Sequence, residues 1–121
     1  MGTALIVDDC LTDLTIITQC LQQRGINVLT ANSGEEAIVK INYNRPDLII
    51  LDVVLPGCSG FEVCRDLKAE TNTSNIPIIL YSTKGGEMDK FWGLRQGADF
   101  YLSKPIDQEE LLRIVKKLLE N

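Results

Sequence analysis

The sequence predicts an α/β domain built on a parallel β-sheet that helices cover on both faces. Short apolar runs rich in Val, Ile and Leu alternate five times with amphipathic stretches of helical length. The runs are almost continuously apolar, which is typical of strands buried on both faces. At 121 residues, the chain has the length of one domain that can bury a hydrophobic core.

Five apolar runs are the predicted strands. They cover residues 4–7, 27–30, 48–51, 76–81 and 100–102. All of them are too short to cross a bilayer, and the N-terminus lacks the basic and apolar regions of a signal peptide. We therefore expect a cytoplasmic protein that does not bind to membranes.

The first two predicted helices have recognisable ends. An apolar stripe at helical spacing marks the first helix, and Gly25 ends it. The stripe consists of Leu14, Ile17 and Leu21. Ser33, followed three residues later by Glu36, forms a capping box that begins the second helix. Both helices are therefore expected to lay one apolar face on the sheet.

The last three helices are predicted in the same way. The third has the stripe Phe61, Cys64 and Leu67, and the fourth has Phe91 and Leu94. The fourth ends near Gly97, while Asp107 with Glu110 begins a fifth helix that runs to the last residue but one. The absence of a linker predicts one domain over residues 1–121, with no output domain attached.

Charge and cysteine spacing argue against several classes of function. The net charge is −5, the pI is about 4.6, and Lys and Arg form no cluster, so we expect no binding to nucleic acid. The chain has four cysteines without a CxxC pair, and it has no histidine to complete a zinc site. We expect Cys10, Cys20, Cys58 and Cys64 to be small core residues.

Chemically reactive side chains follow four of the five predicted strands. Asp8 and Asp9 follow the first strand, Asp52 the third, Ser82 and Thr83 the fourth, and Ser103, Lys104 and Pro105 the fifth. Parallel α/β sheets bind ligands outside the carboxyl ends of their strands. Three carboxylates, one or two hydroxyls and one lysine are therefore expected to converge on one edge of the sheet.

This combination suits phosphoryl transfer to a carboxylate. Clustered carboxylates repel each other unless a cation joins them, and an all-oxygen site suits Mg²⁺. We assign Mg²⁺ to Asp8 and Asp9 beside Asp52, nucleophilic attack to Asp52, and the phosphoryl oxygens to Lys104 and Ser82. Taken singly, Asp9 is more often a helix N-cap, Lys104 a surface lysine and Ser82 a loop hydroxyl.

An ordered set of short motifs resembles the receiver domain of bacterial response regulators. The motifs are Asp8-Asp9, Leu51-Asp52, Leu55-Pro56, Gly60, Ser82 and Lys104-Pro105. The resemblance covers the whole chain and implies a flavodoxin-like α/β/α fold, with five parallel strands in the order 2-1-3-4-5 and five helices. It also implies a signalling switch rather than an enzyme, in which Asp52 accepts a phosphoryl group from a histidine kinase or phosphotransfer domain.

The resemblance implies further site residues. The backbone carbonyl of Val54 would join the aspartates at Mg²⁺. Ser82, Thr83 and Tyr101 would form the switch, in which the Ser82 hydroxyl turns toward the phosphoryl group and Tyr101 changes rotamer. Thr83 is bulkier than the Ala that the family usually has at this position. A downstream protein would bind to the fourth helix, the fifth strand and the fifth helix.

The sequence also bears on pathway and assembly. Residues 89–98 are similar to single-domain regulators of twitching motility or phototaxis. They include Trp92, for which a partner contact and half-burial against a neighbouring helix are both open. The chain is expected to be a monomer or a phosphorylation-dependent dimer.

Three competing functions share parts of this pattern. A degenerate receiver would bind proteins without being phosphorylated. A flavodoxin-type FMN binder needs a hydroxyl-rich and glycine-rich anion cradle where this chain has Asp8 and Asp9. A dehalogenase-type phosphatase needs a second Asp where Val54 stands.

Overall fold

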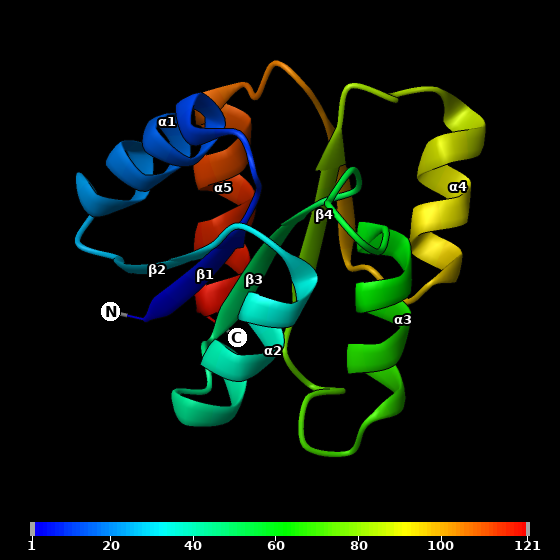
Figure 1. Cartoon of the computed structure of the whole chain (residues 1–121). Helices are drawn as coiled ribbons and strands as arrows, with labels where there is room; N and C mark the ends of the chain where they lie inside the picture. The colour runs from blue at the N-terminus through cyan, green and yellow to red at the C-terminus, as the bar shows by residue number, and fades with distance from the viewer. Residues whose placement is uncertain (1, 121) are drawn as a thin grey trace.

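Five parallel strands form one sheet in the order β2-β1-β3-β4-β5, as predicted (Figure 1). The computed structural model describes residues 2–120. The strands are β1 (Thr3–Val7), β2 (Asn27–Ala31), β3 (Leu48–Asp52), β4 (Ile78–Ser82) and β5 (Phe100–Ser103). The fourth strand begins later than predicted because Pro77 has no N–H to donate to the sheet, although Ile76 is buried.

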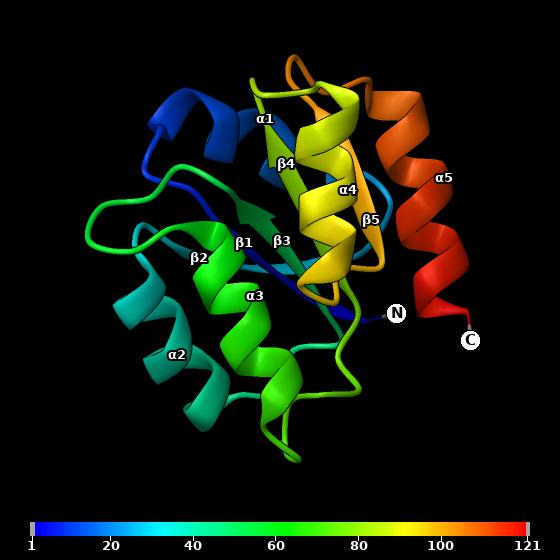
Figure 2. The same cartoon turned by 90° about the vertical axis from the view of Figure 1, so that its right-hand side faces the viewer.

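Five helices cover the two faces of the sheet and give the three predicted layers. They are α1 (Leu11–Gln22), α2 (Gly34–Tyr43), α3 (Gly60–Ala69), α4 (Glu87–Arg95) and α5 (Gln108–Leu119). One core lies between the sheet and α1 and α5, and a second lies on the face of α2, α3 and α4. Figure 2 looks onto this second face. The fold is flavodoxin-like.

The predicted capping residues are confirmed, although α5 ends at Leu119, one residue earlier than predicted. The Ser33 hydroxyl accepts a hydrogen bond from the backbone N–H of Glu36 at 3.1 Å at the start of α2. The Asp107 carboxylate accepts one from the N–H of Glu110 at 3.2 Å at the start of α5. Positive φ angles occur at the glycines that follow α1 and α4, which are Gly25 and Gly97. These polar contacts satisfy N–H groups that a helix leaves without partners.

The predicted buried stripe of α4 is wrong. Phe91 is 54% exposed and Leu94 is 50% exposed, whereas the buried residue of this helix is Gly93. A Cβ at position 93 would lie 2.6 Å from Cδ2 of Tyr101. The helix approaches β5 so closely that its glycine, rather than its large apolar side chains, faces the sheet.

The cysteines are core residues only in part. Cys20 and Cys64 are buried and Cys58 is half-buried, but Cys10 is exposed. The prediction is wrong for Cys10 because this residue lies in the loop between β1 and α1, at the carboxyl ends of the strands. Among the described residues, no helix has the length and apolar character needed to span a membrane.

Candidate functional site

The carboxyl edge of the sheet brings the predicted aspartates together. One carboxylate oxygen from each of Asp8, Asp9 and Asp52 lies within 4.8 Å of the other two. Asp8 and Asp52 are buried and Asp9 is exposed. Asp9 does not cap a helix, because the N-cap residue of α1 is Cys10 and no side chain caps this end. Two buried carboxylates and one exposed carboxylate therefore form an acidic cluster open to solvent.

Successive side chains of a strand point to opposite faces of the sheet, so Asp52 and Ser82 belong to different faces. Asp52 continues the series of Leu48 and Ile50, which face α1 and α5. Ser82 continues the series that includes Leu80, which faces α2, α3 and α4. A phosphoryl group on Asp52 would therefore lie between groups that belong to opposite layers of the fold.

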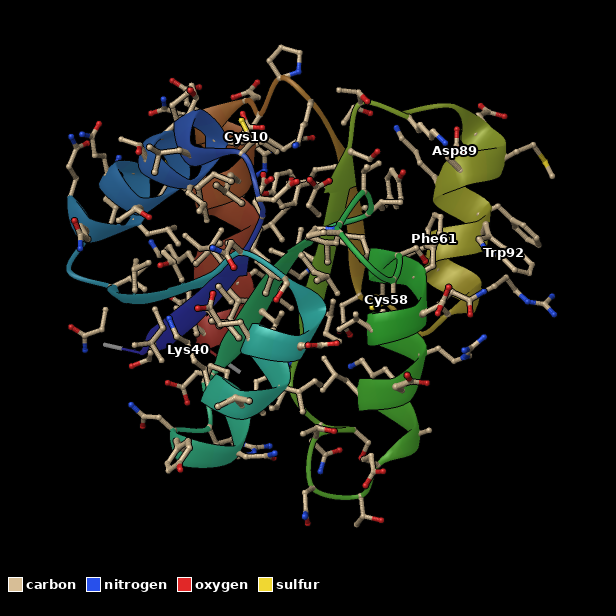
Figure 3. The ribbon with its side chains drawn as sticks, viewed as in Figure 1. Cys10, Lys40, Cys58, Phe61, Asp89 and Trp92 are labelled. Carbon is tan, nitrogen blue, oxygen red and sulfur yellow. The ribbon has the colours of Figure 1, made fainter. Side chains whose placement is uncertain are left out.

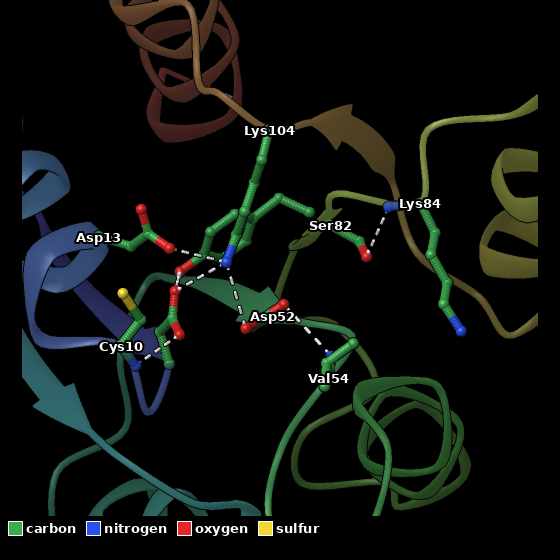
Figure 4. A network of polar contacts seen from close by, with 9 residues as sticks. Cys10, Asp13, Asp52, Val54, Ser82, Lys84 and Lys104 are labelled. Carbon is green, nitrogen blue, oxygen red and sulfur yellow. Dashed lines mark hydrogen bonds and ion pairs between the residues drawn. The ribbon is translucent and has the colours of Figure 1, made fainter.

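Lys104 contacts two aspartates of the acidic cluster and a third aspartate outside it. Its Nζ lies 2.9 Å from Oδ2 of Asp13, and 3.3 Å from Oδ2 of both Asp8 and Asp52 (Figure 4). Burial lowers the pKa of Lys104, but the hydrogen bond with Asp13 and the surrounding negative charges outweigh it, so the pKa lies above its usual value. One ammonium group thus offsets the charge of several carboxylates.

The two buried aspartates are also held by neutral donors. Oδ1 of Asp8 accepts a hydrogen bond from the N–H of Cys10 at 2.9 Å, and its Oδ2 accepts one from the Tyr81 hydroxyl at 2.5 Å. Oδ1 of Asp52 accepts one from the N–H of Val54 at 3.2 Å. These bonds hold both carboxylates in defined orientations at the edge of the sheet.

Ionisation of Asp52 is opposed by its surroundings. Burial and the nearby charge of Asp8 raise the pKa of Asp52 to about 6, although the Val54 N–H and the Lys104 ammonium favour the charged form. The carboxylate is therefore ionised at neutral pH, but it is more basic than an ordinary aspartate. A cation bound between Asp8, Asp9 and Asp52 would relieve this repulsion.

The donor set fits Mg²⁺ by its chemistry. The clustered carboxylates of Asp8, Asp9 and Asp52 offer only oxygen atoms. Oxygen ligands suit Mg²⁺, whereas zinc sites use mostly nitrogen and sulfur atoms. The hydrogen bond to Asp52 also places Val54 beside the cluster.

The predicted switch residues meet at the loop after β4. The buried Ser82 hydroxyl accepts a hydrogen bond from the N–H of Lys84 at 3.1 Å. The Tyr101 hydroxyl donates to the carbonyl of Lys84 at 2.6 Å, and its ring is buried. Thr83 is exposed beside them. Ser82 of β4 and Tyr101 of β5 thus both form hydrogen bonds with the backbone of Lys84.

Trp92 lies on the outer surface of α4 (Figure 3). It is 54% exposed, so its ring is half-buried at most and remains accessible to a partner. The exposed apolar side chains of this helix are Met88, Phe91, Trp92 and Leu94. The structure shows this apolar surface, but the sequence pattern assigned part of it to the core.

Two polar partners in the site were not among the predicted site residues. Asp13 lies in the first turn of α1 and contacts Lys104, while Tyr81 contacts Asp8. Position in the sheet could have indicated Tyr81, because it is the register partner of Asp52 and therefore shares its face. No comparable signal marks Asp13.

The peptide bond between Lys104 and Pro105 is cis.

Comparison with known proteins decides the family. The profile of the response regulator receiver domain matches residues 4–116. The chain belongs to the response regulator receiver family. It is 41% identical over 119 residues to Protein PilH of Pseudomonas aeruginosa, and the match covers 98% of each chain. It is also 41% identical to the regulatory protein PhoP of Bacillus subtilis, but covers only 47% of that protein.

Solved receiver structures agree with the family match. A putative response regulator from Chloroflexus aurantiacus superposes with a TM-score of 0.95 at 38% identity, covering 99% of this chain and 98% of that one. The chemotaxis protein CheY4 of Vibrio cholerae gives a TM-score of 0.90 at 33% identity, covering 98% and 99%.

Membership of the family fixes the class of activity. Receiver domains are signalling switches of two-component systems, which take phosphoryl groups from histidine kinases and act on downstream targets. They generally use Mg²⁺ at an acidic pocket, and this receiver has a cluster of three aspartates. The family match decides against the flavodoxin-type and dehalogenase-type interpretations.

Proposed function

We propose that this receiver accepts a phosphoryl group on Asp52 in a Mg²⁺-dependent reaction, with a histidine kinase or phosphotransfer domain as donor. The observation that supports this is the convergence of one ammonium and two further carboxylates on Asp52. Nζ of Lys104 lies 3.3 Å from Oδ2 of Asp52, and Asp8 and Asp9 lie beside it. Phosphoryl transfer depends on placing positive charge around the oxygens of the transferred group.

Each group has a distinct part in the reaction. Asp52 is the nucleophile, and its raised pKa of about 6 leaves it ionised yet basic at neutral pH. Lys104 turns from the carboxylates to the oxygens of the phosphoryl group. Asp8, Asp9 and the carbonyl of Val54 would hold Mg²⁺, which supplies charge neutralisation at the same oxygens.

The switch follows from the contacts of Lys84. The Ser82 hydroxyl now binds the Lys84 N–H, and the Tyr101 hydroxyl binds the Lys84 carbonyl. A phosphoryl group on Asp52 adds acceptor oxygens that draw Ser82 away from Lys84. The loop after β4 then loses one of its two restraints, and Tyr101 is released toward a second rotamer. Thr83, exposed in this loop, moves with it.

The readout surface consists of α4, β5 and α5. The exposed apolar side chains of α4, including Trp92, support a protein partner at this surface. Motility or taxis is the proposed pathway, supported by the likeness to Protein PilH and to the chemotaxis protein CheY4. A cytoplasmic location is part of the same proposal.

Intact-mass measurement tests the phosphorylation directly. Acetyl phosphate with Mg²⁺ should add one phosphoryl group to the unmutated protein, and Asp52→Asn should abolish the adduct because an amide cannot act as the nucleophile. Asn nearly preserves the shape of the side chain, so the fold should remain. Chelation of Mg²⁺ should also abolish the adduct.

A matched control is Asp66→Asn. Asp66 is an exposed aspartate of α3, outside the acidic cluster, and this variant should be phosphorylated like the unmutated protein. An adduct that persists in Asp52→Asn would show that another residue is the acceptor. An unmutated protein that takes neither a phosphoryl group nor beryllofluoride would instead be a degenerate receiver that only binds proteins.

A further inference from the structure

The Tyr81 hydroxyl is a fully buried polar group to which the proposed chemistry gives no role. Tyr81 lies beside Asp52 in the strand register and has no exposed surface. Its hydroxyl donates to Oδ2 of Asp8 at 2.5 Å. Neighbouring strands lie about 4.8 Å apart, so the phenol reaches from β4 past β3 to the residue that follows β1. A shorter hydroxyl side chain could not make this contact.

Asp8 has three hydrogen-bond donors, one of which is expected to leave it when Asp52 is phosphorylated. Oδ1 accepts a hydrogen bond from the backbone N–H of Cys10, while Oδ2 accepts from Tyr81 and from Lys104, whose Nζ lies 3.3 Å away. Lys104 is the ammonium that turns to a phosphoryl group on Asp52 in the proposed function. Once it has turned, Tyr81 is the side chain that still holds Oδ2 of Asp8.

We propose that Tyr81 is a positioning residue of the metal site, whose hydroxyl holds the Asp8 carboxylate in the orientation that binds Mg²⁺. This inference rests on the proposed function, because it assigns Mg²⁺ to the aspartate cluster. Partners of metal-binding carboxylates commonly set metal affinity by fixing the ligand in place. Burial and the bond to Asp8 raise the pKa of Tyr81 far above its usual value, so the donor remains a neutral hydroxyl.

The ring of Tyr81 has a separate contact that a test must preserve. Nζ of Lys104 lies 4.8 Å from the centre of the ring, within the range of a cation–π interaction. Tyr81→Phe keeps the ring and this contact and removes only the hydroxyl. The exposed Tyr43 of α2, which is 88% exposed, offers the same chemical change away from the site as Tyr43→Phe.

Titration with Mg²⁺ alone tests the positioning role. Amide chemical shifts of Cys10 and Val54 report binding at the cluster without any phosphodonor. We expect the Kd of Tyr81→Phe for Mg²⁺ to rise about tenfold, whereas that of Tyr43→Phe stays unchanged. A Kd within twofold of the unmutated value in Tyr81→Phe would overturn the inference.

Phosphorylation kinetics separate positioning from a merely structural effect. The Mg²⁺ concentration that gives the half-maximal rate with acetyl phosphate should rise about tenfold in Tyr81→Phe, while the rate at saturating Mg²⁺ stays close to that of the unmutated protein. A structural defect would reduce the amount of active protein without moving that concentration. A lower saturated rate with an unchanged half-maximal concentration would overturn the positioning role.

A measurement on the unmutated protein covers the case in which Tyr81→Phe does not fold. The tyrosine Cζ resonance of Tyr81 should shift on Mg²⁺ addition with the same midpoint as the Val54 amide, and that of Tyr43 should not shift. If Mg²⁺ binds but the Tyr81 resonance does not shift, the inference is overturned and the proposed function is unaffected. Mg²⁺ binding with a Tyr81 response but without phosphorylation would overturn the proposed function alone. Absence of Mg²⁺ binding would overturn both.

Discussion

Asp52 is a carboxylate whose surroundings make ionisation costly. It is buried beside Asp8, and its pKa is raised to about 6, with burial as the largest cause. In the unfolded chain, an aspartate has a pKa of about 3.9. The folded protein therefore binds the proton more tightly than the unfolded chain does. The stability that this gives is complete below about pH 4 and is lost as the pH rises through about 6.

Asp52→Asn should consequently stabilise the protein at neutral pH in the absence of Mg²⁺. We expect a gain of about 1–2 kcal/mol in the free energy of unfolding above pH 7, about half of that near pH 5 and none near pH 4. Urea unfolding between pH 4 and 7.5 in the presence of a chelator measures it. Asp66→Asn should show no such pH dependence, and a loss of stability in Asp52→Asn at pH 7.5 would contradict the prediction.

We expect Asp13 to compete with a phosphoryl group for Lys104. Its Oδ2 makes the shortest of the three contacts of Nζ, at 2.9 Å, and the Asp13 side chain is only 33% exposed. Asp13→Asn removes one negative charge and frees the ammonium, so beryllofluoride should bind about two- to fivefold more tightly at saturating Mg²⁺, the equivalent of about 0.5–1 kcal/mol. Amide shifts during titration measure it. Weaker binding would show that Asp13 instead holds Lys104 in its working position.

The site residues at strand ends could be predicted from the sequence, whereas the side chains that contact them from other positions could not. Asp8 and Lys104 follow strands and Asp52 is the last residue of one, and parallel strands end at a common edge, so their meeting could be predicted. Asp13 comes from a helix turn and Tyr81 from inside a strand. Their contacts depend on side-chain rotamers, which a linear pattern does not specify.

In α4, close packing overrides the apolar pattern of the sequence. Its large apolar side chains repeat at helical spacing, yet Gly93 is the buried position. The interpretation from spacing failed because spacing identifies an apolar face but not what the face packs against. A helix can present its smallest residue to a bulky neighbour, here Tyr101, and leave its apolar side chains for another protein.

Gly93→Ala should therefore destabilise the protein, although Ala favours helices. The added Cβ would lie 2.6 Å from Cδ2 of Tyr101 and 3.2 Å from Cδ1 of Leu80. We expect overpacking to cost about 1–3 kcal/mol, offset in part by about 1 kcal/mol of helix propensity. Urea unfolding measures the net loss, with the exposed Lys90→Ala of the same helix as control. The loss should shrink in a Tyr101→Ala background, and an equal loss there would contradict the assigned clash.

The layered architecture was predictable because it depends on how apolar runs alternate with helical stretches along the chain. Continuous apolar runs in β1, β3 and β4 can be buried only between two helical layers, and all three are buried along almost their whole length. The exposed surface is a weaker signal, because apolar side chains such as Phe91 look the same in sequence whether they face a core or a partner.

The same architecture determines which elements should respond structurally when Asp52 is phosphorylated. Ser82 and Tyr101 both bind Lys84, the loop continues directly into α4, and Gly93 of α4 rests on Tyr101. These contacts form one connected path through β4, α4 and β5. The strand order places β2 at the opposite edge of the sheet, so we expect α2 and β2 to remain unchanged.

Beryllofluoride with Mg²⁺ should therefore change amide hydrogen exchange in residues 83–103 and leave 27–43 unchanged. Loss of the Ser82 bond to Lys84 removes a restraint on the loop, so exchange should become several-fold faster at Lys84 and at the start of α4. Mass spectrometry measures these exchange rates. The two controls are the unmutated protein with Mg²⁺ alone and Asp52→Asn with the same reagents. Tyr101→Phe removes the second bond to Lys84, so its loop should already exchange faster before activation and change less on activation, while Asp52 is still modified. Changes confined to α2, or equal changes in Asp52→Asn, would show that the signal leaves the site by another route.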